Sequence, residues 1–321
     1  MAKYRDNLPQ LSGDLFLTDG GFETTLVFHE GFDLPEFASF PLLKTESGRA
    51  KMREVLERYI PLATKNGLGF VLEPPTWRAN PDWAAKIGYS PEELDEANRQ
   101  AIIFMEELRD AHETQKSPMP ISGCIGPQDD GYNPSSFMSV ETAEKYHQVQ
   151  INTLKDTATD FVTSFTICYV DEAIGIVRAA QNADMPVAIG FTVETDGRLP
   201  SGQPLKEAIE QVDAETNSVP IYYMINCAHP THFIDVLTDG GEWLERIQAI
   251  RANSSCMSHE ELDNAEELDE GNPQQMGQEY LALRTKLPNL NVLGGCCGTD
   301  HRHVEAIRNA WMQKPRQALA S

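Results

Sequence analysis

Two adjacent cysteines, Cys296 and Cys297, stand in the segment NVLGGCCGTDHRHVEAI (residues 291–307), with two glycines before them and one after. A third cysteine, Cys227, ends another apolar run, IYYMINCA (221–228). Two neighbouring thiols can form a disulfide, lie buried as unrelated side chains, or bind one metal ion. The disulfide is the least favoured of these, because bridging adjacent residues requires distorted geometry.

A shared metal site requires the chain to leave strand geometry between Cys296 and Cys297, because adjacent strand residues point to opposite faces. We expect Gly294, Gly295 and Gly298 to supply that backbone freedom. Three thiolates that leave a fourth position open are typical of a catalytic zinc site, and sulfur ligands favour zinc over magnesium or calcium. We interpret the other cysteines as packing residues: Cys124, Cys168 and Cys256.

Histidines close to these cysteines are alternative ligands. His229 and His232 follow Cys227, and His301 and His303 follow the adjacent pair. Their spacings do not place two histidines on one helix face. Hydrogen bonding at the start of a helix is the simpler interpretation.

Short apolar runs bounded by Gly, Pro, Asn or Asp alternate with helical patterns, which is typical of strands buried on both faces. One helical segment has Ser90 as its expected N-cap and Pro91 at its first position. The expected strands are 15–20, 69–74, 120–126, 160–167, 186–193, 221–228, 247–254 and 291–298.

Eight strands alternating with helices predict the α/β class and a (β/α)8 TIM barrel, as a single domain over residues 1–321. A doubly wound open sheet is the alternative, although no GxGxxG motif follows the first strand. The acidic stretch 257–280 is expected to form a helical insertion. In a barrel, Cys227 would end strand 6 and the adjacent cysteines strand 8. These strands have the same parity, so the thiols can converge.

Composition restricts the partners. Of 321 residues, 49 are acidic and 26 basic, which gives a formal charge of −23 and argues against nucleic acid or anionic lipid as a partner. The start MAKYRDNLPQ has no secretory pattern, and no apolar run is long enough for a membrane helix. We therefore expect a cytoplasmic protein.

The motifs TDGGFETTL (18–26), INCAHP (225–230) and GGCCGTDHRHVEAI (294–307) resemble those of the zinc-dependent homocysteine S-methyltransferases, with FTVETDGRLPSGQPLKEAI (191–209) as a fourth similar segment. This family includes betaine–homocysteine and S-methylmethionine–homocysteine methyltransferases. The resemblance covers nearly the whole chain.

The resemblance implies a role for each matching residue. Cys227, Cys296 and Cys297 match the Zn²⁺ ligands, and no catalytic residue beyond the zinc site is implied. The segment Asp19, Gly20 and Gly21 matches the one that holds the amino-acid end of homocysteine. Asn226 matches the residue before the first zinc cysteine and is expected to contact either a ligand of the zinc or the substrate.

One position departs from the family. A glutamate on strand 4 usually anchors the homocysteine ammonium, and counting back from Glu172 places Phe165 there. Glu73, at the end of strand 2, is a candidate replacement, and a buried carboxylate there is expected to meet a cation from Arg78 or from the substrate. A structural pair of Glu73 with an arginine or with backbone donors is the alternative to a substrate contact. Trp77 is either a cation–π contact for the methyl donor or a core residue.

Together these features predict a methyltransferase that moves a methyl group from a small sulfonium or ammonium donor to a zinc-bound thiol, homocysteine or a related one, as in methionine biosynthesis. We expect no room after strand 8 and its helix for a cobalamin or folate module within this polypeptide. The partners are therefore a small thiol acceptor and a small onium donor, and the sequence is compatible with a homo-oligomer. A non-catalytic zinc or thiol sensor and a zinc hydrolase are the alternatives.

Overall fold

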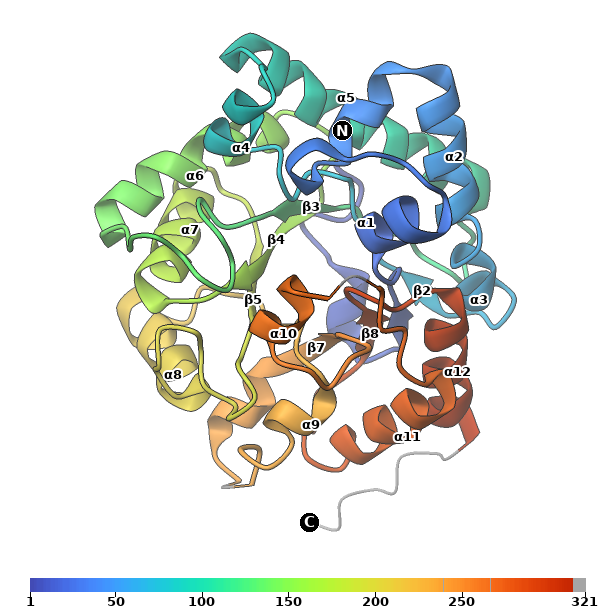
Figure 1. Cartoon of the computed structure of the whole chain (residues 1–321), viewed down its shortest axis with the longest axis vertical. Coiled ribbons are helices and arrows are strands. Elements are labelled where there is room, and N and C mark those ends of the chain that lie inside the picture. The colour runs from blue at the N-terminus through green and yellow to red at the C-terminus, as the bar shows by residue number, and fades with distance from the viewer. Residues whose placement is uncertain (239, 266, 314–321) are drawn as a thin grey trace.

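A computed structural model describes residues 1–238, 240–265 and 267–313. Eight parallel strands form the centre, and helices surround them (Figure 1). Every strand lies inside a range expected from the sequence, although each is shorter. The strands are β1 (Phe16–Leu17), β2 (Gly69–Phe70), β3 (Ser122–Ile125), β4 (Phe161–Ile167), β5 (Val187–Phe191), β6 (Tyr223–Asn226), β7 (Ile247–Ala252) and β8 (Val292–Gly295).

The longer helices follow the strands and cover the outside of the sheet. The α-helices are α1 (Phe22–Thr24), α2 (Glu46–Leu56), α3 (Ile60–Thr64), α4 (Pro81–Lys86), α5 (Pro91–His112), α6 (Val140–Lys155), α7 (Val170–Asn182), α8 (Leu205–Thr216), α9 (Pro230–Phe233), α10 (His259–Asp263), α11 (Pro273–Leu283) and α12 (His301–Gln313). Shorter turns are η1 (Pro9–Ser12), the π-helical η2 (Thr25–His29), η3 (Pro35–Phe37), η4 (Phe40–Lys44) and η5 (Glu242–Arg246).

The sheet closes on itself. Its strand order is β2-β1-β8-β7-β6-β5-β4-β3, with parallel pairing throughout. Beyond β2, the Leu72 N–H donates to the Pro120 carbonyl at 2.9 Å, and the Ser122 N–H donates to the Leu72 carbonyl at 2.9 Å. These bonds join the two end strands, so the prediction of a single-domain (β/α)8 barrel is confirmed and the open sheet is excluded.

Alternation along the strands sorts the side chains into two layers. Phe161 and Phe165 of β4 point into the barrel, where they belong to one apolar cluster with Tyr222 and Met224 beside β6. Val162 belongs to the larger cluster between sheet and helices, and so does Ile167, because β4 is irregular between Ser164 and Ile167. The barrel interior is therefore filled by side chains, and room for a ligand remains only at its ends.

Local sequence signals define several helix starts. Ser90 accepts a hydrogen bond from the Glu93 N–H, and the Glu93 carboxylate accepts one from the Ser90 N–H. This capping box, with Pro91 at the first helical position, confirms the predicted N-cap of α5.

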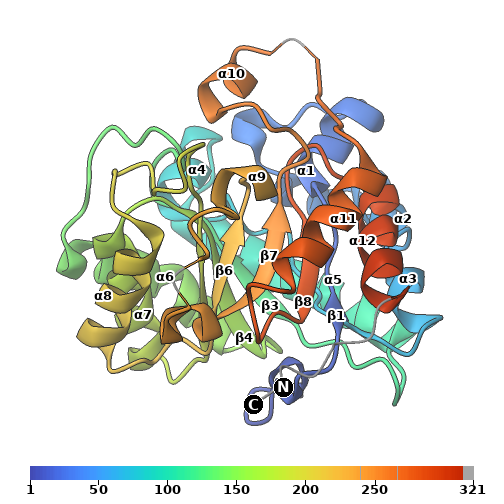
Figure 2. The ribbon, with the colours of Figure 1, turned by 90° about the horizontal axis from the view of Figure 1, so that it is seen from below.

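The acidic stretch 257–280 contains α10 and the first part of α11, and Glu266 lies outside the described residues. Figure 2 shows α10 beyond the carboxyl ends of the strands, whereas α11 packs beside α12. The interpretation of this stretch as an insertion, and the domain limits 1 and 321, stay predictions. Among the described residues, no helix is long and apolar enough to cross a membrane.

Candidate metal centre and substrate cavity

Three cysteine sulfurs converge at the carboxyl end of the barrel. Cys227 follows β6, and Cys296 and Cys297 follow β8. Their Sγ atoms all lie within 4.8 Å of one another. Convergence from two strands of equal parity is the arrangement expected from the sequence. Such a cluster can hold a metal ion.

Backbone conformation and backbone hydrogen bonds orient these thiols. Cys227 adopts a left-handed conformation with φ of 56°, which turns its side chain away from the course of β6. Its N–H donates to the Arg251 carbonyl at 2.9 Å, and the Cys296 N–H donates to the Ala252 carbonyl at 2.8 Å. Adjacent residues of β7 thereby fix the segments that carry the thiols.

The glycines beside the adjacent cysteines have two different roles. Gly298 has a positive φ of 75°, as expected for a residue that supplies backbone freedom. Gly294 and Gly295 instead belong to β8, and a Cβ on them would collide with Thr18 and Thr299, respectively. The expectation that these two supply freedom is therefore wrong. Gly294 permits close packing of β8 against the segment after β1, and Gly295 permits close packing against Thr299 after β8.

The sulfurs influence one another's ionisation. Hydrogen bonding from Cys296 and Cys297 lowers the pKa of Cys227 well below its usual value. The same interaction with Cys227 raises the pKa of Cys296 to about 12 and that of Cys297 well above the usual range. The three thiols therefore act as one coupled group, in which ionisation of Cys227 opposes that of its two neighbours.

Tyr132, from the loop after β3, is a residue of this site that the sequence did not single out. Its hydroxyl hydrogen-bonds with the Cys227 sulfur, and burial raises the pKa of Tyr132 well above its usual value. Its ring lies 3.9 Å from the His259 ring, centroid to centroid. Asn253 adds a weak contact, with Nδ2 at 4.0 Å from Cys227 Sγ.

Arg251, near the end of β7, is the second residue that sequence reasoning missed. Its guanidinium lies between two carboxylates, with Nη2 bound to Asp19 and Nη1 to Glu73. It also donates from Nη2 to the Gly20 carbonyl at 2.9 Å and from Nε to the Gly295 carbonyl at 2.8 Å. Burial raises the pKa of Asp19, and Arg251 opposes that shift.

Glu73 was expected to meet a cation from Arg78 or from the substrate. The residue that binds it is Arg251. Arg78 instead lies between two indoles, with its Cζ 4.0 Å from the Trp77 ring centroid and 3.6 Å from that of Trp83. The pairing of Glu73 with Arg78 is therefore wrong, whereas the alternative of a structural pair with an arginine is confirmed by Arg251. The segment after β2 meets β7 at the mouth of the barrel, while the Arg78 side chain is buried between the two indoles.

Phe165 faces the same guanidinium, since the Arg251 Cζ lies 5.2 Å from the centroid of its ring. The next residue, Thr166, has a positive φ of 56°, and its N–H donates to Asn226 Oδ1 at 2.9 Å. Asn226 therefore fixes an irregular point of β4, and its buried Nδ2 has no partner among the described residues.

The segment after β1 packs against the segment after β8. The Gly21 N–H donates to the Thr299 carbonyl at 2.9 Å, and a Cβ on Gly21 would collide with the Cys296 carbonyl. A Cβ on Gly20 would press on Thr299. The glycines of the TDGG motif thus allow Asp19 to approach the adjacent cysteines.

These groups line one cavity. Its wall contains five aromatic side chains and three carboxyl groups, from Asp19, Glu23 and Glu73. The aromatic lining residues are Phe22, Phe37, Trp77, Tyr132 and Phe165. Glu23 accepts a hydrogen bond of 2.7 Å from Ser39, and burial raises its pKa. Among the described lining residues, Arg251 is the only basic one.

Trp77 combines the two roles considered for it. It is partly buried against the cluster inside the barrel and also lines the cavity. Its Nε1 donates to Thr166 Oγ1 at 3.0 Å, and one face of its ring is covered by Arg78.

The homocysteine S-methyltransferase family model matches residues 16–311. The chain belongs to the homocysteine S-methyltransferase family. Its fold is similar to that of the homocysteine methyltransferase MmuM from Escherichia coli, in a metallated form (TM-score 0.72, 17% identity) and an oxidised form (TM-score 0.73, 18% identity). In both comparisons the match covers 92% of this chain and 96% of the other.

Membership in this family identifies the chain as an enzyme that transfers a methyl group to a thiol. The three cysteines lie where such a reaction needs a site, at the carboxyl ends of the barrel strands. Zinc binding and the substrate roles of Asp19, Gly20, Gly21, Asn226 and Glu73 stay predictions.

The other three cysteines of this methyltransferase differ in their exposure to solvent. Cys124 and Cys168 are buried, and Cys124 also lines the cavity. Cys256 is exposed, so its interpretation as a packing residue is wrong. It lies in the loop that follows β7, where the chain leaves the core.

The histidines make structural hydrogen bonds. His229 caps α9 by accepting from the Thr231 N–H, and His303 lies in the first turn of α12, where its Nδ1 accepts from the Asp300 N–H at 3.1 Å. His232 contacts the Cys256 carbonyl, and His301 packs edge-on against Tyr59. The cysteine cluster includes no histidine among the described residues.

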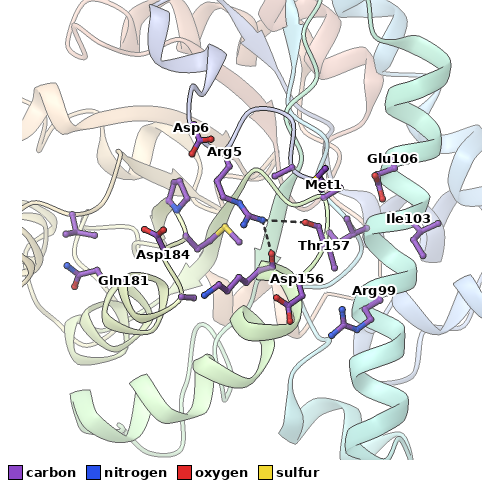
Figure 3. A pocket seen from close by; sticks show the side chains of 18 residues that line it. Met1, Arg5, Asp6, Arg99, Ile103, Glu106, Asp156, Thr157, Gln181 and Asp184 are labelled. Carbon is purple, nitrogen blue, oxygen red and sulfur yellow. Dashed lines mark hydrogen bonds between the residues drawn. The ribbon is translucent and has the colours of Figure 1, made fainter.

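A larger hollow, of about 1240 Å³, lies at the opposite end of the barrel (Figure 3). It is formed by the N-terminal segment and by the residues that precede β4, β5 and β6. Arg5 crosses it and donates to the carbonyls of Lys155 and Thr157. In a barrel enzyme this end serves stability, so the cavity beside the cysteines is the candidate methyl-transfer site.

Proposed function

We propose that this enzyme uses zinc held by Cys227, Cys296 and Cys297 to methylate a small thiol, homocysteine or a related one, from a small onium donor. The observation that carries the proposal is the convergence of three sulfurs on one point of the substrate cavity. The proposed place of action is the cytoplasm, because free thiols persist in a reducing compartment.

The residues present fit zinc. Three thiolates are a preferred donor set for this ion and leave a fourth position for an exogenous ligand. Cys227 is almost fully buried and one of its neighbours is a hydrogen-bonding hydroxyl, that of Tyr132. Such contacts orient a ligand and tune its basicity. Bound there, zinc would supply the positive charge that keeps an acceptor thiol ionised near neutral pH.

The chain's own contribution to the reaction is placement. The acceptor sulfur attacks the methyl carbon in line with the bond to the donor heteroatom. A sulfur–carbon bond forms, and the electron pair of the breaking bond leaves with the donor as a neutral sulfide or amine. No protein acid is required, because the leaving group needs no proton. The protein accelerates the step by holding both reactants in this alignment.

Asp19 and Glu73 are proposed to bind the acceptor's ammonium. These two carboxylates share one guanidinium, that of Arg251, so one negative charge in the group remains unmatched. An ammonium would neutralise it. Glu73 would then replace the glutamate that Phe165 displaces. Gly20 and Gly21 let the backbone approach that end of the substrate, and Asn226 holds the neighbouring bend of β4.

The donor's charge is matched by the cavity wall. Aromatic faces attract onium ions, and five aromatic side chains line the cavity. Glu23 adds a carboxylate that accepts from the neutral Ser39 hydroxyl and forms no ion pair with any residue that the structure describes. A cation placed there would gain an ion pair that the protein itself does not supply.

The test combines metal analysis and methyl transfer. The purified full chain, loaded with zinc, is incubated with methyl-labelled sulfonium and ammonium donors and a panel of thiols, homocysteine first. We expect one zinc per chain and a labelled thioether. Cys296→Ala should lose both, whereas Cys256→Ala, which changes an exposed cysteine of another loop, should retain both. Full activity in a zinc-free protein would contradict the proposal.

A further inference from the structure

The acidic stretch between β7 and α11 carries a buried histidine, His259, at the first position of α10. His259 is 8% exposed, whereas the next two residues, Glu260 and Glu261, are exposed. Ser258 fixes this helix start, because its hydroxyl accepts from the Glu261 N–H at 3.3 Å and its N–H donates to the Glu261 carboxylate at 2.8 Å. The short helix therefore directs its imidazole toward the barrel and these two carboxylates toward solvent.

Two segments at the carboxyl end of the barrel contact the His259 ring. The Tyr132 ring, from the loop after β3, lies 3.9 Å away, centroid to centroid, with 32° between the two planes. At the end of β5, Thr192 Oγ1 lies 3.5 Å from His259 Nε2, and the imidazole forms a further hydrogen bond with the Val193 backbone. His259 thereby joins the loop after β3 to the end of β5.

The backbone of the loop after β3 is held independently of His259. Asp130 Oδ1 accepts from the Tyr132 N–H at 2.8 Å. A Cβ on Gly131 would lie 3.0 Å from the Thr166 carbonyl oxygen, so this glycine lets the loop pack against the bend of β4. These contacts position the Tyr132 backbone, but they do not select the direction of its side chain, which has several staggered rotamers.

The direction of the Tyr132 side chain matters for the sulfur cluster. Its hydroxyl donates a hydrogen bond to Cys227, and the residue lines the cavity. Of the residues that the structure describes, only His259 forms an aromatic contact with the Tyr132 ring. A side chain without a ring at position 259 would allow the phenol to turn away and lose the sulfur.

We propose that His259 is a positioning residue of the metal centre, whose ring holds the Tyr132 hydroxyl on the Cys227 sulfur. The inference rests on the proposed zinc site and deepens it, because it makes a residue of the acidic stretch part of the surroundings of a metal ligand. A hydrogen bond to a ligand atom draws electron density from it and fixes its orientation, and loss of such a contact weakens metal binding by about 10–100-fold. His259 itself does not belong to the sulfur cluster.

The experiment replaces zinc by Co²⁺, whose sulfur-to-metal charge-transfer absorption reports on the electron density of the thiolates. The metal-free full chain and its variants are loaded with Co²⁺, and their spectra are compared. Tyr132→Phe removes the hydroxyl alone. His259→Gln removes the ring but keeps a polar group for Val193, and His259→Phe keeps a ring without the polar group. His29→Ala is the matched control, since it frees the same acidic stretch by breaking the 2.7 Å contact with Glu270, which does not involve Tyr132.

We expect Tyr132→Phe to move the charge-transfer band to longer wavelength, because a sulfur that accepts no hydrogen bond gives up its electrons at lower energy. His259→Gln should produce the same shift, and the double variant should add nothing to it, since the histidine acts through the tyrosine. His259→Phe should leave the band closer to its wild-type position than His259→Gln does, and His29→Ala should leave it unchanged. Zinc affinity, measured by competition with a chelator, should fall about tenfold or more in Tyr132→Phe and His259→Gln.

Two results would overturn the inference: a band that does not move in Tyr132→Phe, or one that moves in Tyr132→Phe but not in His259→Gln. An equal shift in His29→Ala would also overturn it, because the effect would then belong to the whole acidic stretch. If His259→Gln does not fold, His259→Asn decides, because it also lacks the ring. Absence of bound metal in the wild type would remove both this inference and the proposed function, whereas bound metal without methylated thiol would overturn the proposed reaction alone.

Discussion

The N–H of Cys227 donates a hydrogen bond of 2.9 Å to the carbonyl oxygen of Arg251. A proposed metal ligand and the guanidinium that joins Asp19 to Glu73 are therefore linked through backbone. The Arg251 side chain separately reaches the Gly295 carbonyl, one residue before Cys296. The proposed metal centre and the proposed acceptor end of the cavity thus share Arg251, the first through its backbone and the second through its side chain.

Arg251→Gln should therefore lower the stability of the fold without removing bound zinc. Zinc should remain stoichiometric, because the bond to Cys227 is made by backbone atoms. The free energy of unfolding should fall by about 3 kcal/mol, because the buried Asp19 and Glu73 lose their cation. Denaturant titration and metal analysis measure the two effects. Arg246→Gln, which breaks a partly exposed ion pair with Asp213, should cost about 1 kcal/mol or less. Loss of zinc in Arg251→Gln would contradict this separation.

Glu23→Gln should weaken the onium donor and leave zinc in place. The amide keeps the size of the side chain and can still accept from Ser39. The KM for the donor should rise about tenfold, the value of one charge-assisted contact, with a smaller change in kcat. Glu36→Gln, an exposed change in η3, is the control and should leave the KM unchanged.

The ionisation of Glu23 should also make the affinity for the onium donor depend on pH. Burial raises the pKa of Glu23, so its negative charge appears as the pH rises through that elevated value. Donor affinity should therefore increase with pH in the wild type, over a range above the usual one for a glutamate. In Glu23→Gln this increase should be absent. A parallel increase in both proteins would assign the effect to another group.

The sequence predicted what depends on periodicity and on motif spacing. Short apolar runs located all eight strands, and the parity of strands 6 and 8 predicted that Cys227 would meet Cys296 and Cys297. It did not predict Arg251, because one basic residue in an apolar run gives no sign of its partners. Those partners, Asp19 and Glu73, follow strands that are distant in the chain, and they meet Arg251 only when the barrel closes.

The errors have the same origin. Arg78 was paired with Glu73 because it is near in sequence, but its side chain turns to Trp83 in α4. The motif suggests that Gly294 and Gly295 give the backbone conformational freedom. The structure shows instead that close packing against Thr18 and Thr299 leaves no room for a side chain at these positions. Both features depend on contacts between distant segments, which local patterns do not encode.

Asn226→Ala should destabilise the protein through the bend in β4. The mutation removes the acceptor of the Thr166 N–H and leaves that buried group without a partner. The expected loss in the free energy of unfolding is about 1–3 kcal/mol. Asn226→Asp keeps an acceptor oxygen, so it should retain more of the Thr166 bond. Chemical denaturation of both variants measures the difference, and equal losses would show that this bond is not the cause.

Asp300→Asn should have an effect on stability that depends on pH. Burial alone would raise the pKa of Asp300, but hydrogen bonds with His303 and Arg302 lower it well below its usual value. A depressed carboxyl pKa stabilises the fold above the unfolded-state value, about 4, and this contribution is lost as the pH falls toward the folded-state value. At pH 7 the variant should be less stable by about 1–2 kcal/mol, since Asp300 also binds the Arg302 N–H in the first turn of α12. The difference in stability between the two proteins should narrow as the pH is lowered below about 4, as measured by urea denaturation at each pH.

Asp110→Asn, an exposed change on α5, is the control and should show no comparable trend. A gap that stays constant with pH would mean that the charge of Asp300 does not stabilise the fold.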